Sequence, residues 1–222
     1  LAMTRFYLLL LVCIGYAATS QAQAGRNCAN AQVIAAGTYT VDTLYLGAAT
    51  NPPVRAGIAA RAKWYKYTPT TSGLMRISSC GGGADTRLFL YTGTRCDSLI
   101  AAGFSDDFCR YHPDSTDEYA AEIAKLVQAN TPYYIEWDNA WSDADFSFSV
   151  SVSAFSPTAN QVCATATNML LGLNQIDSLH GFSSRGDANR ANWYKYTATR
   201  TGNLTISSCG GDVDTRLWVY RG

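Results

Sequence analysis

Charged residues are scarce in this sequence of 222 residues. They make up 15% of the chain, and 17 Lys and Arg balance 17 Asp and Glu, whereas average soluble proteins contain about 25%. With a net charge of zero and no basic stripe, the chain has nothing to hold a phosphate backbone. Nucleic acid is therefore a poor candidate for its partner.

Histidine is almost absent, with only His112 and His180 in the chain. A base for nucleophilic catalysis would have to be one of them, and neither lies in a recognisable partner pattern. HExxH, a phosphate-binding glycine loop and a dinucleotide fingerprint are all missing. The stretch Gly181-Phe182-Ser183-Ser184-Arg185-Gly186 does not have the spacing of a nucleophile elbow. We expect a protein that is not an enzyme and requires no cofactor.

Long hydrophobic runs are also missing apart from one near the start. Arg5 precedes an apolar segment at 6–18, and Ala22-Gln23-Ala24 follows it, which is the pattern of a signal peptide over residues 1–24. No other segment approaches the roughly 18 apolar residues that a membrane helix needs. We therefore expect an exported protein, secreted or at the cell surface, with no membrane span once the signal peptide is removed.

The dominant feature of the sequence is an internal repeat. Residues 64–93 align without a gap with residues 193–222, and 19 of the 30 positions are identical. A segment that recurs later in the same chain indicates an array of similar structural units. We assign a first repeat to residues 25–155, a linker to 156–162 and the N-terminal part of a second repeat to 163–222. We expect the chain to be a fragment of a longer protein, so that the rest of that polypeptide is itself a partner.

Alternating residues predict strands throughout the first repeat. At 146–153, phenylalanine and valine alternate with serine, which is the pattern of a strand with one buried face. We predict further strands at 38–46, 62–68, 74–79, 86–92 and 133–137, and a polar loop over 93–117. Residues 119–127 fit a helical stripe as well as a strand, and we favour a strand because the neighbouring segments are strands. The fold class predicted is all-β, a tandem of antiparallel, jelly-roll-like β-sandwiches with the second copy truncated.

Six cysteines follow the signal peptide, and they are expected to form disulfides because the protein is exported. The six are Cys28, Cys80, Cys96, Cys109, Cys163 and Cys209. The four in the first repeat allow three pairings, of which we favour Cys28 with Cys80 and Cys96 with Cys109. Zinc is the weaker alternative, because no two cysteines have the spacing of a zinc site and neither histidine is placed to help.

An ordered set of short motifs resembles a known family. It consists of WYKYTP at 64–69, SSC at 78–80, DTRL at 85–88, Asp106-Asp107 with Cys109, YYIEWD at 133–138 and the closing strand. Together these motifs resemble bacterial pre-peptidase C-terminal-like domains over all of the first repeat and the front of the second. The resemblance implies a β-sandwich accessory domain that is not itself catalytic, located beside catalytic or adhesive parts of a large secreted protein.

An acidic set suggests a possible calcium site. The candidate ligands are Asp106, Asp107, Asp138, Asp143 and Asp145, since calcium takes six to eight oxygens, often from loop carboxylates. Asp85 and Asp214 begin the two copies of the DTRL strand. The alternative is that Asp85 caps a turn and pairs with Arg87 while the other carboxylates face water.

Aromatic and arginine side chains suggest a site for sugars, which stack on exposed rings. The candidates are Trp141, Arg87, Phe89 and Tyr91 in the first repeat and Arg216, Trp218 and Tyr220 in the second. Most aromatics are expected to fill the core, but Trp141 lies in a polar turn. It is the first choice for a ligand contact.

The function predicted is extracellular binding or adhesion, directed to a glycan or a surface protein. The alternative is an ancillary domain of a secreted hydrolase or peptidase whose catalytic part lies outside this sequence.

Overall fold

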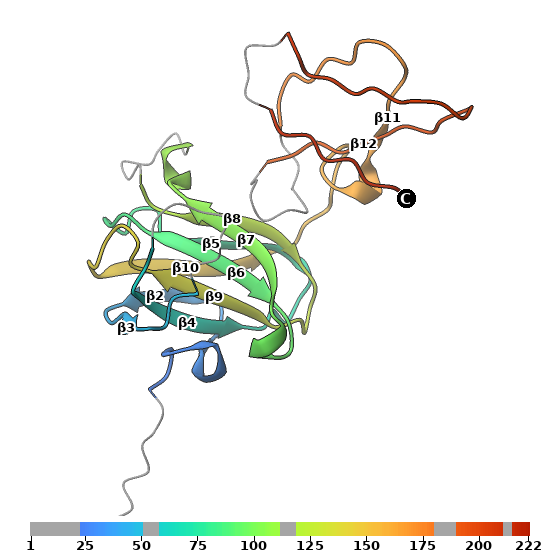
Figure 1. Cartoon of the computed structure of the whole chain (residues 1–222). Coiled ribbons are helices and arrows are strands. Elements are labelled where there is room, and N and C mark those ends of the chain that lie inside the picture. Colours follow the sequence, from blue (N-terminus) through green and yellow to red (C-terminus); the bar gives the residue numbers. More distant parts are fainter. Residues whose placement is uncertain (1–22, 51–57, 112–118, 180–189, 211–214) are drawn as a thin grey trace, which may run out of the picture.

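The computed structural model describes residues 23–50, 58–111, 119–179, 190–210 and 215–222 (Figure 1). Residues 1–22 of the expected signal peptide, His112 and His180 lie outside these ranges. Within them, no helix has the length and apolar character needed to cross a bilayer.

The described residues between positions 32 and 153 form two packed sheets (Figure 1). The six-stranded sheet contains β1 (Gln32–Ile34), β3 (Tyr45–Leu46), β4 (Arg61–Tyr67), β6 (Arg87–Thr92), β7 (Ile100–Asp106) and β9 (Tyr133–Asp138). The four-stranded sheet contains β2 (Gly37–Val41), β5 (Gly73–Ser78), β8 (Glu122–Val127) and β10 (Phe146–Ser153). The ladders are antiparallel except for β1 with β4, which is parallel. The predicted all-β sandwich is confirmed.

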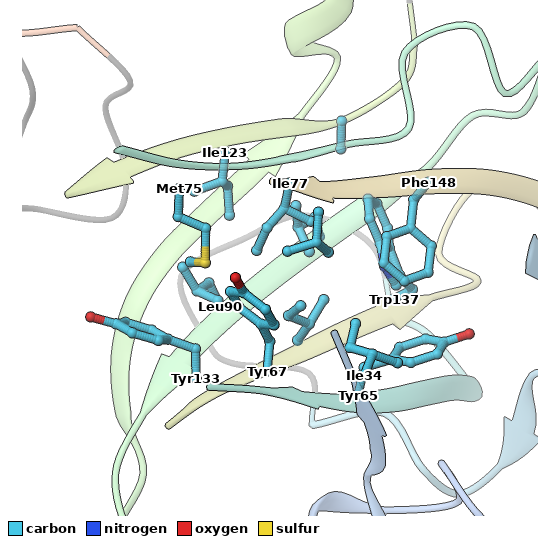
Figure 2. Close-up of a cluster of buried hydrophobic side chains, with 14 of the residues drawn as sticks. Ile34, Tyr65, Tyr67, Met75, Ile77, Leu90, Ile123, Tyr133, Trp137 and Phe148 are labelled. Atoms are coloured by element: carbon cyan, nitrogen blue, oxygen red, sulfur yellow. The ribbon is translucent and has the colours of Figure 1, made fainter. Parts of the chain in front are cut away.

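The core lies between the two sheets and follows the predicted alternation. Phe146, Phe148 and Val150 of β10 are buried, whereas Ser147 and Ser151 between and beyond them are exposed. Figure 2 shows residues of both sheets meeting in one cluster. Burying one face of β10 accounts for the period of two in its sequence.

β9 occupies the middle of the six-stranded sheet, where the order of strands is β1-β4-β9-β6-β7. All of its residues are buried. β6, which lies between β9 and β7, also buries residues on both faces. Strands covered on both sides do not show a simple polar alternation.

The prediction of a polar loop over residues 93–117 was wrong, because β7 crosses this region after a short 3₁₀ helix, η2 (Cys96–Ser98). β7 has weak strand propensity, since Ala101, Ala102 and Gly103 form its middle. Gly103 packs against Ile123 of β8, and a Cβ built there would lie 3.0 Å from Ile123 Cδ1. Its small residues thus serve a close approach between sheets that the sequence pattern does not show.

The sequence did not fully determine the secondary structure of two other segments. The strand predicted at 38–46 is divided into β2 and β3, which belong to different sheets. The segment at 119–127, which also fitted a helix, contains strand β8 as predicted, and β8 pairs with β5 over its whole length.

The disulfides join Cys28 to Cys96 and Cys80 to Cys109, so the predicted pairing was wrong. Cys28 begins the 3₁₀ helix η1 (Cys28–Asn30) and packs on the outer side of the six-stranded sheet, with Trp64 and Tyr134 in its cluster. Cys80 follows β5 in the other sheet. The two sheets separate them, and each instead meets a cysteine that flanks β7.

The second copy repeats the local structure of the first. Its 3₁₀ helix η4 (Cys163–Thr165) matches η1, and its parallel pair β11 (Thr167–Asn168) and β12 (Tyr194–Lys195) keeps the register of β1 and β4. Trp193 stacks on Tyr220 at 5.7 Å, as Trp64 stacks on Tyr91 at 5.5 Å. Within the described residues of this copy, β11 and β12 are the assigned strands (Figure 1). Cys163 and Cys209 are exposed and not disulfide-bonded.

Peptide mapping of the oxidised, unreduced protein should find Cys28 linked to Cys96 and Cys80 linked to Cys109. The bridges close loops with sequence separations of 68 and 29 residues, so chain entropy predicts that each contributes about 4 kcal/mol to the free energy of unfolding. The double variant Cys28→Ala with Cys96→Ala should show a loss of that order in denaturant unfolding. A peptide joining Cys28 to Cys80 would contradict the structure.

Candidate functional site

The outer face of the six-stranded sheet carries a buried ion pair between Arg87 of β6 and Asp138 of β9. The two residues are register partners, and Arg87 Nε donates to both Asp138 carboxylate oxygens at 3.0 Å while Nη2 donates to Oδ2 at 2.7 Å. Both side chains are almost fully buried. Burial raises the pKa of Asp138, and the Arg87 guanidinium opposes that rise. A buried pair of this kind is costly to break, because removing one partner leaves the other charge uncompensated.

This ion pair changes two of the predicted roles. Arg87 was a candidate for binding a sugar, and Asp138 was a candidate calcium ligand. In the structure they bind each other away from solvent. Asp138 accepts the bidentate pair from Arg87. The recurring Asp-Thr-Arg motif therefore supplies a structural arginine in the first copy.

Phe89 and Tyr91, the other members of the predicted binding face, are also used in packing. Phe89 is 3% exposed and packs between the Arg87 guanidinium, 5.2 Å from its ring centre, and Phe104 at 4.9 Å. Tyr91 stacks on Trp64. Arg87 and Phe89 are therefore buried in packing contacts, and Tyr91 is half-buried.

Glu136 lies beside these aromatics and was not singled out in the sequence. It is completely buried, and its carboxylate accepts hydrogen bonds from Thr50 N at 2.7 Å, Thr50 Oγ1 at 2.6 Å and the Tyr91 hydroxyl at 2.9 Å. Burial raises the pKa of Glu136 to about 7, although the Thr50 and Tyr91 hydrogen bonds act to lower it. The available signal was its place in YYIEWD: a glutamate between Ile135 and Trp137, in a strand that is central to its sheet, is covered on both faces.

At one end of the six-stranded sheet, three carboxylates converge next to an exposed tryptophan. Asp85, Asp106 and Asp107 place carboxylate oxygens within 4.8 Å of one another. Trp141 lies in the loop between β9 and β10, is 47% exposed, and donates its indole N–H to Asp106 Oδ2 at 3.1 Å. We call these four residues the Trp141 edge.

Strand pairing explains why the Trp141 edge forms. β7 ends at Asp106, which is the register partner of Arg87 at the start of β6, so the residue two before Arg87 lies near the end of β7. β9 ends at Asp138, also paired with Arg87, and its loop then brings Trp141 to the same end. Asp107 has a φ of 56°, a conformation that aspartate tolerates better than most residues.

The remaining members of the predicted acidic set do not join this cluster. Asp143 accepts a hydrogen bond from Asn139 at 2.8 Å and forms an exposed ion pair with Arg61 at 3.7 Å. Asp145 is exposed. Three clustered carboxylates are suitable ligands for a hard cation such as calcium, with backbone carbonyls and water supplying the other oxygens that calcium requires.

The candidates in the second copy are more open than their counterparts. Arg216 and Tyr220 are exposed and Trp218 is half-buried, whereas the equivalent Arg87 and Phe89 are buried. Tyr220 nevertheless stacks on Trp193, so it repeats a packing contact of the first copy.

An open hollow of about 550 Å³ lies beside the Cys28–Cys96 bridge and is lined in part by Lys66, Arg95 and Tyr134. The Lys66 ammonium lies over the Tyr134 ring at 5.5 Å, and Arg95 forms an ion pair with Asp97 at 2.5 Å. Its described lining contains neither a histidine nor a hydroxyl nucleophile placed beside a base.

Raising the pH through neutrality should destabilise the first domain through Glu136. Its pKa is raised from 4.5 to about 7 on folding, so its stabilising contribution is complete below pH 4.5 and is lost as the pH rises through 7. Between pH 5 and pH 8 this one group should reduce the free energy of unfolding by about 2 to 3 kcal/mol.

The measurement is denaturant unfolding of the wild-type protein and Glu136→Gln at a series of pH values. Other titrating groups contribute equally to both, so the difference between the two slopes isolates Glu136. Parallel curves for the two proteins would show that its pKa is not raised.

Comparisons with known proteins add a distant likeness of fold. No protein-family model matches the chain, and no curated protein matches it. Among solved structures, the crystal structure of the pre-peptidase C-terminal domain of collagenase from Bacillus anthracis is similar, with a TM-score of 0.33 and 12% sequence identity, over 55% of this chain and 93% of that one. This match does not assign a function to the chain.

Proposed function

We propose that the chain is a non-catalytic, extracellular binding module that contacts a glycan through the Trp141 edge. The observation that carries the proposal is the placement of Trp141. Its ring is about half exposed, yet its indole N–H is held by Asp106 at 3.1 Å. An aromatic ring fixed at the surface can stack on a sugar without a large loss of side-chain freedom.

The surroundings of Trp141 supply the polar contacts that a sugar needs. Carboxylates of Asp106 and Asp107 lie at the same end of the sheet and can accept hydrogen bonds from sugar hydroxyls. The other buried ionic groups described above have partners within the domain. Arg87 pairs with Asp138, and Glu136 accepts hydrogen bonds from Thr50 and Tyr91. These bonds stabilise the sandwich. The arrangement of these groups therefore supports a role in binding better than a role in acid–base catalysis.

We propose that the protein is secreted or located at the cell surface. Two disulfides stabilise the first domain, as is typical of proteins that fold in an oxidising compartment. The motifs that resemble pre-peptidase C-terminal-like domains fit the same interpretation, that of an accessory module in a larger secreted protein.

Replacing Trp141 with alanine should weaken glycan binding at least tenfold while leaving the thermal midpoint nearly unchanged, because the side chain is half exposed. We would titrate soluble glucan, xylan, mannan and chitin oligosaccharides against the protein by calorimetry. Ile100→Ala is the matched control, since Ile100 is an exposed apolar residue at 67% and begins β7 at the end of the strand opposite Asp106. Equal losses in both variants, or no binding to any of these glycans, would refute the proposal.

Calcium at the Trp141 edge stays a prediction of the acidic set. A saturating ion that binds only the folded state should raise the thermal midpoint relative to chelator, by about 2.7 kcal/mol of stability at 100 times its dissociation constant. Asp107→Asn should abolish the shift, whereas Asp145→Asn, outside the cluster, should retain it. An unchanged midpoint of the wild-type protein in calcium would exclude the site.

A further inference from the structure

The hollow beside the Cys28–Cys96 bridge is framed by two segments that this disulfide joins. Residues of η1 line one side of it, and residues 94–97, at the start of η2, line another. These segments include the short blue and green coils near β4 in Figure 1. The volume of about 550 Å³ is within the range of small-ligand sites, roughly 300 to 1,000 Å³. We call it the Lys66 hollow, after the lysine in its lining.

Three neighbouring strands contribute a row of side chains to the Lys66 hollow. Lys66 of β4 is the register partner of Val33 in β1 and of Tyr134 in β9, and all three residues line the hollow. Ile34 and Tyr67, each one position further along its strand, belong to the core instead. Because side chains alternate between the faces of a sheet, the row lies on the outer face, where backbone pairing sets its spacing.

Lys66 brings a positive charge that no carboxylate balances. Its ammonium lies 5.5 Å from the centre of the Tyr134 ring, a distance at which a cation is attracted to the ring face. Within the described residues, this ammonium forms no ion pair and no hydrogen bond, and the Tyr134 hydroxyl also lacks a hydrogen-bond partner there. A lysine ammonium has three N–H donors. The hollow therefore offers a positioned cation whose donors are unused by the domain.

The other charged residues in the lining, Arg95 and Asp97, are paired with each other. Arg95 Nε donates to Asp97 Oδ1 at 3.2 Å, and Nη2 donates to Oδ2 at 2.5 Å. Two cations and one carboxylate give the described lining a net charge of +1, and the unbalanced charge belongs to Lys66. The Trp141 edge, which has three carboxylates, follows the opposite end of β9 from Tyr134. The two places therefore favour ligands of opposite charge.

We propose that the Lys66 hollow binds the carboxylate of a uronic acid residue in an acidic glycan, at a site separate from the Trp141 edge. The Lys66 ammonium pairs with the carboxylate, while the hydroxyls of Tyr134 and Thr94, both in the lining, bond to hydroxyl groups of the sugar. Alanine and valine side chains of the lining contact the C–H groups of the ring. A uronic acid carries hydroxyls beside its carboxylate, whereas an acidic peptide side chain would leave these protein hydroxyls unpaired.

The probe is a trisaccharide of galacturonic acid, titrated by calorimetry against the whole protein. The wild-type protein should bind it, and added salt should weaken the binding because it screens the attraction between charges. The fully methyl-esterified trisaccharide keeps the rings and loses the charge, so it should bind at least tenfold more weakly. No binding of the acid, or equal binding of the ester, would overturn the proposal. Equally tight binding of triglutamate would also overturn it, since the hollow would then recognise acidic peptides.

Charge-removing variants locate the binding at Lys66. Lys66→Met keeps the alkyl chain and should weaken trisaccharide binding about tenfold or more. Lys125→Met is the control, because Lys125 is another half-buried lysine but lies on β8 of the other sheet. Trp141→Ala should bind the trisaccharide as the wild type does, so this result is distinct from the test of the Trp141 edge. A loss in Trp141→Ala with none in Lys66→Met would contradict the proposal.

A matched pair at Val33 tests the same charge without replacing the lysine. Val33 is 78% exposed, so a polar residue can replace it without entering the core. Val33→Asp puts a carboxylate beside Lys66 and should reduce trisaccharide binding at least tenfold relative to Val33→Asn, which has the same shape and no charge. Equal affinities of these two variants would refute a role for Lys66, even if Lys66→Met did not fold.

Discussion

The position of β9 between β4 and β6 is the constraint on which the rest of the first domain depends. This order places a strand from late in the sequence between two strands from its first half. It brings Trp137 and Ile135 into the core on one face and sets Glu136 and Asp138 against β6 on the other. The buried pair of Arg87 and Asp138 exists only because these strands are neighbours, and its geometry in turn fixes their register.

The second copy keeps the contacts of the first that are local in the chain. These are its 3₁₀ helix, its aromatic stack and its short parallel ladder. Nineteen identities in thirty positions are enough to preserve this local structure.

Buried and exposed side chains are divided between the interior of the six-stranded sheet and its end. Side chains with the most suggestive chemistry, including Arg87, Asp138 and Phe89, are buried and bonded within the domain. Trp141, by contrast, is carried on a loop at the sheet's end, where antiparallel pairing also gathers three carboxylates. Loops presented by a rigid sandwich can vary without loss of the core, which suits them to recognition.

The sequence by itself determined the repeat, the all-β class, the buried face of most strands and the choice of Trp141 as a surface aromatic. These features are local: they depend on a period of two, on turn residues and on the identity of aligned positions. Residues 101–103 show where such local signals fail. Alanine and glycine give no alternating pattern of large apolar and polar residues, so this part of β7 is not recognisable as a strand from the sequence alone.

Only the tertiary structure decided which cysteines pair, which aspartates gather and which arginine is buried. Each of these depends on the order of strands across the sheets, which brings together residues that lie 29 to 68 positions apart in the disulfides. A period of two says which face of a strand is buried. It does not say which strand is the neighbour. The neighbouring strand decides whether a side chain is used in a structural contact or is left at the surface, where it could bind a ligand.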